Sequence, residues 1–266
     1  MSMRTSFLSA AVLSLFVVSG CGGGGGGGES TSTAAKSTGS GGHASGEAAA
    51  GTFGTSRISG KVTFEGTAPK AKSVKMDADP YCGAQHPGGA TAAEYVVGPG
   101  GGLKWVFVYV KEGLASDYSK PGAEVILDQK GCTYEPHVFG IMVGQKLKIL
   151  NSDETLHNIH SLPKNSRQFN LAMPRAGMEL EQKFKKPEVM VRIKCDVHPW
   201  MESYAGVLSH PFHSVTGADG SFDLGRLPAG TYTIEAWHED GGVQTQSVTV
   251  GEGESAEINF SFKVQA

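Results

Sequence analysis

The segment with the most reactive side chains runs from Cys195 to Met201 and reads CDVHPWM. It offers a thiolate at Cys195, an imidazole at His198 and a thioether at Met201 within seven residues. A second imidazole, His157, lies upstream, after the β-forming segment KLKIL and the mostly polar residues 151–156. Two nitrogens, one thiolate and a weak axial thioether are the donors of a trigonal type 1 copper site. The sequence therefore predicts one type 1 copper ion bound by His157, Cys195, His198 and Met201.

The residues that lead into this loop alternate between two faces, as they do along a strand with one side in the core. One face carries Val189, Val191, Ile193 and Cys195, and the other carries Met190, Arg192 and Lys194. Cys195 is thus expected at the inner end of a core-facing strand. His198 and Met201 then lie on the turn that follows, and a tight turn can direct all three donors toward one point.

Most of the remaining chain consists of short segments rich in β-forming residues, separated by Gly, Pro, Asn and Asp. The expected strands are residues 58–64, 103–111, 124–127, 146–150, 189–195, 204–208, 231–237, 244–250 and 256–262. Residues 165–176 are the one helical candidate, weakened by Pro174. A length of 266 residues, 39% of them hydrophobic, can fill a core. The pattern predicts an all-β fold with one or two sandwiches.

Two features resemble the cupredoxin family, and within it the amicyanin and plastocyanin branch. They are the loop C-x2-H-x2-M and the run from Tyr134 through Gly144 to His157-Asn158, which together cover roughly residues 124–210. The resemblance implies a Greek-key β-sandwich over residues 119–210 with the four copper ligands named above. It also implies that Asn158 steadies the cysteine loop by hydrogen bonding. Residues 162–178 depart from the family pattern.

The flanking segments resemble a carboxypeptidase regulatory-like, or transthyretin-like, module. Its second half matches the turn at Ala218-Asp219-Gly220 and the hairpin up to Trp237, and its first half matches Gly60-Lys61-Val62 and residues 66–69. We expect residues 57–118 and 211–266 to form this small β-sandwich, with the copper domain inserted in it. Two consecutive domains behind an unrelated N-terminal piece are the alternative. Modules of this kind serve as interaction or sugar-binding scaffolds, so the resemblance allows carbohydrate as a partner.

The N-terminal residues have the pattern of an export signal followed by a tether. Arg4 precedes the apolar residues 7–18, which have the length of a signal-peptide core and are too short to cross a bilayer. The tetrapeptide that ends at Cys21 resembles the bacterial lipobox. This implies that residues 1–20 are removed as a lipoprotein signal peptide and that Cys21 is lipidated; an ordinary secretory signal is the alternative. Residues 21–56 are then a flexible linker with a reach of roughly 30 Å.

The chain has four cysteines, and export would place them where disulfides persist. With Cys21 lipidated and Cys195 bound to metal, Cys82 and Cys132 remain to form a disulfide. A metal site formed by Cys82, His86, Cys132 and His137 is the alternative, although its spacings match no zinc pattern. Four further histidines are expected outside the copper site: His160 at its rim, and His210, His213 and His238 in solvated or structural positions.

Charge and site chemistry narrow the function. A net charge of −3 without a basic block argues against nucleic-acid binding. Protein donors fill every copper position, so we expect no enzymatic activity. The leading prediction is an exported lipoprotein facing the periplasm or cell surface that transfers electrons between redox partner proteins and contacts the membrane only through its lipid. Alternatives are a non-redox lipoprotein that binds carbohydrate or protein, copper sequestration, zinc binding, and a sandwich without metal.

Overall fold

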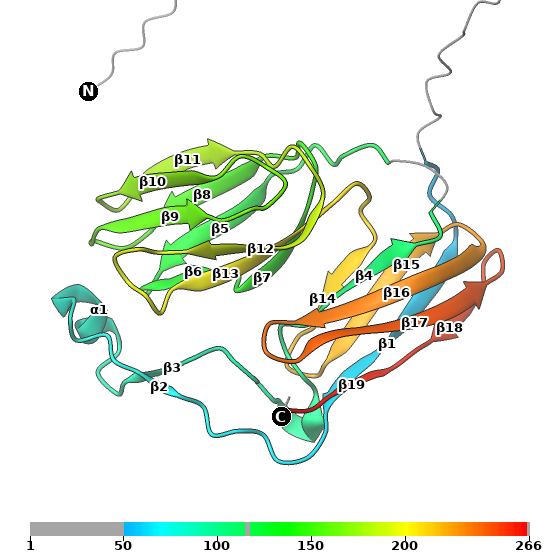
Figure 1. Cartoon of the computed structure of the whole chain (residues 1–266), viewed down its shortest axis with the longest axis horizontal. Coiled ribbons are helices and arrows are strands. Elements are labelled where there is room, and N and C mark those ends of the chain that lie inside the picture. The colour runs from blue at the N-terminus through cyan, green and yellow to red at the C-terminus, as the bar shows by residue number, and fades with distance from the viewer. Residues whose placement is uncertain (1–50, 115–117, 265–266) are drawn as a thin grey trace, which may run out of the picture. The chain divides into compact units, whose positions relative to one another are not determined.

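The computed structural model describes residues 51–114 and 118–264, which form two β-sandwiches (Figure 1). The all-β prediction is confirmed for these residues. The predicted signal peptide, the lipidation at Cys21 and most of the linker lie outside them. Among the described residues, no helix is both long and apolar enough to cross a membrane.

The first sandwich is built from segments on both sides of the second one. One of its sheets contains β1 (Ser56–Phe64), β15 (Ser221–Leu227), β18 (Ser255–Glu257) and β19 (Phe260–Phe262). The other contains β14 (His213–Val215), β4 (Phe107–Glu112), β16 (Gly230–His238) and β17 (Gly242–Val250). The β1 strand pairs antiparallel with β15 and parallel with β18 and β19. The chain therefore leaves this sandwich after β4 and returns to it at β14.

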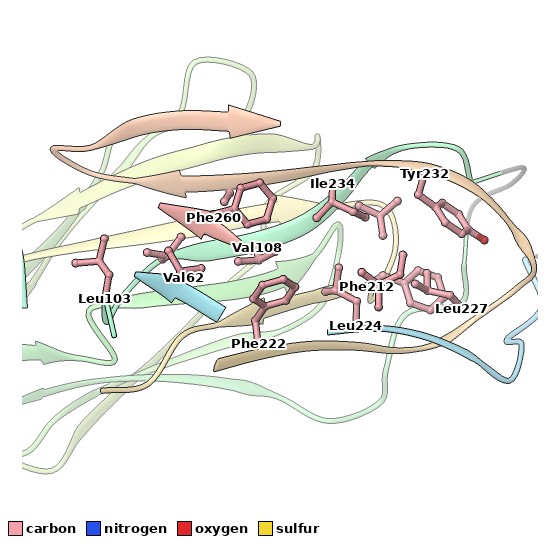
Figure 2. Close-up of a cluster of buried hydrophobic side chains, with 14 of the residues drawn as sticks. Val62, Leu103, Val108, Phe212, Phe222, Leu224, Leu227, Tyr232, Ile234 and Phe260 are labelled. Atoms are coloured by element: carbon pink, nitrogen blue, oxygen red, sulfur yellow. The ribbon is translucent and has the colours of Figure 1, made fainter. Parts of the chain in front are cut away.

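The core of the first sandwich lies between these two sheets (Figure 2). Alternate residues of β1 and β15 point inward, including Val62 from β1 and Phe222 and Leu224 from β15. Val108 and Ile234 meet them from the opposite sheet. Burial on every second residue is the signature of a strand with one face in the core.

The second sandwich is formed by residues between β4 and β14. Its five-stranded sheet has the order β10 (Phe169–Met173), β9 (His157–Ser161), β12 (Glu188–Lys194), β13 (Glu202–Leu208) and β7 (Val138–Met142). Its four-stranded sheet has the order β11 (Met178–Gln182), β8 (Leu147–Asn151), β5 (Val125–Lys130) and β6 (Thr133–Glu135). Ile149, Ile159, Phe184 and Ile193 are among the fully buried side chains at its centre.

The predicted helix at residues 165–176 is wrong. Residues Phe169–Met173 form β10, which pairs antiparallel with β9 along its whole length, from Phe169 opposite Ser161 to Met173 opposite His157. Phe169 and Leu171 are half-buried and Met173 is buried, while the two residues between them are exposed, so the period is that of a strand. Pro174 cannot donate the next ladder hydrogen bond, which is consistent with the strand ending at Met173.

Two of the predicted strands differ from the observed ones for a clear structural reason. The strand expected over residues 103–111 begins only at Phe107, because Trp105 has a φ of 67°, in the left-handed region that strands exclude. The strand expected over residues 256–262 is divided into β18 and β19. Asn259, between them, accepts the backbone N–H of Lys61 with its side chain instead of continuing the ladder.

A long excursion joins β1 to β4 and leaves the first sandwich. It carries β2 (Ser73–Val74), the helix α1 (Pro80–Gln85), β3 (Ala90–Thr91) and the 3-10 turn η1 (Pro99–Gly101). In Figure 1, α1 lies apart from the strands of the first sandwich. A disulfide between Cys82 of α1 and Cys132 of the β5–β6 turn attaches the helix to the second sandwich. The excursion between two strands of the first sandwich is thus bonded to the second sandwich.

Two glycines in the five-stranded sheet allow close packing against the first sandwich. Gly140 of β7 and Gly206 of β13 lie opposite each other in the ladder. A Cβ atom on Gly206 would lie 2.2 Å from Cζ of Phe107, and one on Gly140 would lie 2.3 Å from Cε1 of His213. Both rings therefore occupy space that any other residue's side chain would fill.

We predict that Gly206→Ala destabilises the protein by about 1–3 kcal/mol, because the added methyl group overlaps the ring of Phe107. Urea unfolding should show a lower midpoint for this variant. Gly88→Ala is the matched control, since no atom lies within 4 Å of the position its Cβ would take. Equal midpoints for the two variants would contradict the close packing described here.

Candidate metal centre

The four predicted ligands come from two neighbouring strands and the loop after them. His157 is the first residue of β9, Cys195 follows the last residue of β12, and His198 and Met201 lie in the β12–β13 loop. The β9 and β12 strands are adjacent and antiparallel. All four side chains are at most 2% exposed. The fold thus brings together residues that are up to 44 positions apart into one buried region.

The donor atoms of the two histidines and the cysteine converge. Nδ1 of His157 lies 2.9 Å from Nδ1 of His198, and the Cys195 sulfur lies 3.9 Å from the latter atom. One donor atom from each of the three residues falls within 4.8 Å of the others. This spacing and this mixture of nitrogen and sulfur donors fit a transition-metal ion.

Backbone hydrogen bonds hold the ligand loop in a tight turn. The N–H of Cys195 donates to the carbonyl of Met201 at 3.1 Å, and the N–H of Met201 donates to the carbonyl of His198 at 2.9 Å. Met201 is buried in the same core cluster as Cys195. The turn therefore brings the backbone of Met201 back beside that of Cys195.

Asn158 contacts the cysteine loop from the neighbouring strand. Its Oδ1 accepts the backbone N–H of Asp196 at 2.7 Å and lies 3.3 Å from the Cys195 sulfur. Its Nδ2 donates to Oδ1 of Asn170 at 2.7 Å. These are the loop-steadying contacts that the cupredoxin resemblance implies for this residue.

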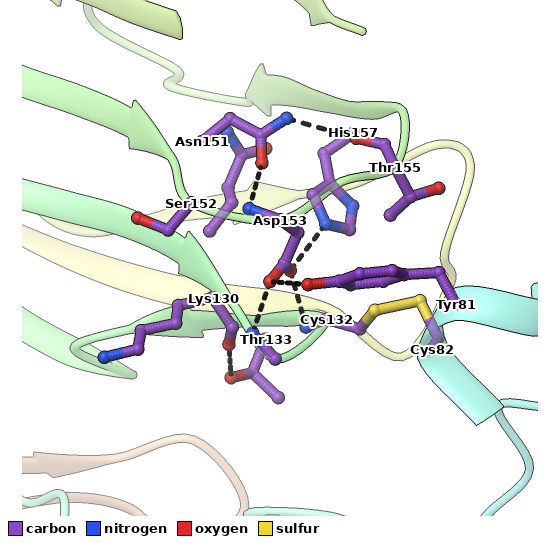
Figure 3. A network of polar contacts seen from close by, with 12 residues as sticks. Tyr81, Cys82, Lys130, Cys132, Thr133, Asn151, Ser152, Asp153, Thr155 and His157 are labelled. Atoms are coloured by element: carbon purple, nitrogen blue, oxygen red, sulfur yellow. Dashed lines mark hydrogen bonds and ion pairs between the residues drawn. A yellow bond between two sulfur atoms is a disulfide. The ribbon is translucent and has the colours of Figure 1, made fainter. Parts of the chain in front are cut away.

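Asp153 orients the first imidazole (Figure 3). Its Oδ2 lies 2.9 Å from Nε2 of His157, and its carboxylate accepts the backbone N–H groups of Gly131 and Cys132, each at 2.8 Å. Burial lowers the pKa of His157, but the contacts with Asp153 and Cys195 outweigh it and raise the pKa to about 9. Because Nε2 is held by the carboxylate, Nδ1 is left to face the other donors.

Asp79 orients the second imidazole while it begins helix α1. Its Oδ1 accepts the backbone N–H groups of Tyr81 and Cys82, as an N-cap residue does. Its Oδ2 accepts the hydroxyl of Thr155 at 2.7 Å and lies 3.1 Å from Nε2 of His198. Although burial raises the pKa of Asp79, these hydrogen bonds lower it to about 2. The carboxylate therefore stays ionised beside the imidazole.

The disulfide places α1 directly over the second imidazole. Cys82 and Cys132 are bonded to each other, and the Cys82 sulfur lies 3.8 Å from Nε2 of His198. The alternative metal site, with Cys82, His86, Cys132 and His137 as ligands, is wrong because the two sulfurs are not thiolates. Nε2 of His86 instead contacts the carbonyl of Gly131, and Nε2 of His137 contacts Glu239.

The remaining predicted histidines lie outside the donor cluster. His160 is at the rim, with its Nδ1 2.9 Å from Oδ2 of Asp196. His210 and His238 are buried rather than solvated, and burial lowers the pKa of both His213 and His238 to about 4. These positions are structural.

Sequence reasoning missed Asp79 and Asp153. The Asp79-Pro80 pair is a helix-start signal, and Asp153 stands four residues before His157, yet neither pattern says which side chain the carboxylate contacts. Trp200 of the ligand loop has its ring centroid 5.0 Å from that of His198 and donates Nε1–H to the carbonyl of Cys132 at 3.0 Å.

No family model and no curated protein matches this chain. Among solved structures, the copper-containing nitrite reductase NirK from Thermus scotoductus SA-01 is 21% identical over 35% of this chain and 24% of its own length, with a TM-score of 0.29. A purple cupredoxin from Nitrosopumilus maritimus is 26% identical over 32% of this chain and 98% of its own, with a TM-score of 0.27. A Cu(I) structure of a mutant amicyanin is 18% identical over 38% of this chain and 97% of its own, with a TM-score of 0.29.

We predict that replacing both Cys82 and Cys132 with serine lowers the free energy of unfolding by about 4 kcal/mol, the chain-entropy value for a loop of 50 residues. Urea unfolding measures this change. A reductant should shift the wild-type curve in the same direction and leave the double variant unchanged. Superimposable curves for wild type and the double variant would contradict a stabilising role for the disulfide.

Proposed function

We propose that this chain is a copper-binding electron-transfer protein, with one type 1 copper ion held by His157, Cys195, His198 and Met201. The observation that carries the proposal is the convergence of two imidazole Nδ1 atoms and one cysteine sulfur within 4.8 Å in a buried region. Both imidazoles are turned toward that region by carboxylates on their outer nitrogens. Such outer contacts fix the ring orientation and tautomer that a metal ligand needs.

The donor set favours copper over zinc. Thiolate and thioether sulfur suit Cu(I), imidazole suits Cu(II), and thioether is a poor ligand for zinc. When bound, copper supplies one-electron chemistry between these two oxidation states. The chain's own contribution is rigidity, because backbone hydrogen bonds close the loop and carboxylates hold both rings. Ligands held in place limit the rearrangement that accompanies a change of charge.

The same features support a carrier rather than an enzyme. All four side chains are buried, and α1 with its disulfide covers the outer edge of His198. With four protein donors no coordination position is left for a substrate. Electrons would then pass between this chain and redox partner proteins.

Attachment to a membrane through a lipid on Cys21, facing the periplasm or cell surface, is a prediction from the sequence alone. The transthyretin-like assignment of the first sandwich is also a prediction from the sequence alone.

We predict that Cu(II) added to the purified protein produces an intense visible thiolate-to-copper band and that Cys195→Ser abolishes it. His160→Ala, which removes a histidine beside the site, should retain the band. Voltammetry should show a reversible one-electron wave for the wild type. A band that persists in Cys195→Ser would refute the ligand assignment, and Cu(I) that cannot be reoxidised would favour sequestration over electron transfer.

We also predict that Asp79→Asn weakens Cu(II) binding about tenfold, because His198 loses its charged outer partner. Asparagine caps helices about as well as aspartate, so the start of α1 should be retained. Competition with a chelator measures the affinity. The control is Asp77→Asn, an exposed aspartate two residues earlier. Equal loss of affinity in both variants would mean that Asp79 does not act through His198.

A further inference from the structure

A cavity of about 920 Å³ opens beside the ligand loop, and Met201 is the one of the four proposed copper ligands that lines it. Pro199, Trp200 and Met201 of that loop line one side of it. Trp105 from the excursion and Tyr204 of β13 line it as well. A volume of this order accommodates a small organic molecule. Because aromatic rings contribute several of the walls, the cavity favours a ligand with a flat apolar part.

The charges on the cavity walls are mostly negative. Its acidic residues are Glu94, Asp128, Glu135, Glu202, Glu239 and Asp240. Among the described lining residues, Lys104 is the single lysine or arginine, and His137 adds one imidazole whose Nε2 lies 2.6 Å from Glu239. The pKa of Asp240 is raised by burial and also by its nearness to Glu239 and Glu94. Glu94 pairs with Lys72 and Glu202 with Arg192, outside the cavity lining. Asp240 has no such ion pair among the described residues and is repelled by Glu239 and Glu94, and a bound cation would relieve that repulsion.

One aromatic ring of the cavity lining already contacts a cationic side chain. The Lys104 ammonium lies 4.0 Å from the centroid of the Trp105 ring, which is a cation–π contact. Trp105 itself has a φ of 67°, a backbone conformation that bulky residues rarely adopt. The fold therefore holds the backbone of Trp105 in an unfavourable conformation beside the cavity. Such strained residues occur more often at functional sites than elsewhere.

The cavity also reaches the metal centre through two side chains, Met201 and Trp200. Trp200 lines it, and the Trp200 ring packs against the ring of His198. The Nε2 edge of His198 is covered by Asp79 and by the disulfide of α1. A ligand in the cavity would thus lie against the same loop that carries three of the four proposed copper ligands.

From these observations we propose that the cavity binds an organic cation with a flat apolar frame, such as an aromatic amine or an aryl guanidinium. The carboxylates, Asp240 and Glu239 among them, would attract its charge, and the rings of Trp105 and Trp200 would pack against its frame. Binding of the cation does not require a metal, so this proposal and the proposed copper function can fail separately.

Titration of the metal-free full chain with phenylguanidinium tests the proposal, with tryptophan fluorescence and calorimetry as readouts. Benzyl alcohol and benzoate are the neutral and anionic comparison compounds. We expect phenylguanidinium to bind about tenfold more tightly than benzyl alcohol, and benzoate not to bind. Added salt should weaken the binding, because screening reduces the attraction of the carboxylates.

Two variants locate the binding. Asp240→Asn should weaken phenylguanidinium binding several-fold, while Asp219→Asn, which removes a charge from a turn that does not line the cavity, should not change it. Trp105→Leu should reduce both binding and the fluorescence response; if that variant fails to fold, the Asp240 pair alone decides the test. Equal affinity for the three compounds would overturn the proposal. So would binding that Asp240→Asn leaves unchanged, or binding of an oligoarginine peptide without any binding of phenylguanidinium.

Discussion

The candidate metal centre depends on the pairing of each buried imidazole with a carboxylate. Asp153 contacts Nε2 of His157, and Asp79 contacts Nε2 of His198. Leaving a buried polar nitrogen without a partner costs about 1–3 kcal/mol, so these contacts define one stable orientation for each ring. In that orientation the two Nδ1 atoms face each other beside the Cys195 sulfur. The donor cluster forms because the carboxylates bind the Nε2 atoms and leave the Nδ1 atoms facing each other.

The two carboxylates reach the site by different routes. Asp153 belongs to the second sandwich, four residues before the histidine it contacts. Asp79 belongs to the excursion from the first sandwich, and its position depends on the disulfide and on its own hydrogen bonds at the start of α1. Neither sandwich contains all of the site. The first one supplies the covering helix, and the glycine pair at Gly140 and Gly206 allows its strands to pack closely against the second.

Sequence patterns were informative where one face of a strand is buried and the other is not. The alternation before Cys195 correctly placed Val191 and Ile193 in the core, but Val189 is only half-buried and packs with Met190 against the cluster that contains Phe107. The prediction was wrong at residues 165–176, because β10 is a five-residue edge strand next to β9, and so short an apolar run does not separate a strand from a helix by its period. The six-residue helix α1 was missed because it is stabilised by its cap and its disulfide rather than by an amphipathic pattern.

The sequence by itself indicated the all-β class, many of the strand positions and four residues with metal-binding chemistry, because residue type and local spacing carry that information. It did not indicate β9, the strand that begins at His157, nor the order of the strands in the sheets. Only the tertiary structure decided which carboxylates hold the imidazoles, that Cys82 and Cys132 are joined, and that α1 covers His198. Those outcomes are contacts between residues as far apart as Asp79 and His198, 119 positions along the chain. Such contacts depend on how the strands and the excursion pack together, and no local pattern encodes that packing.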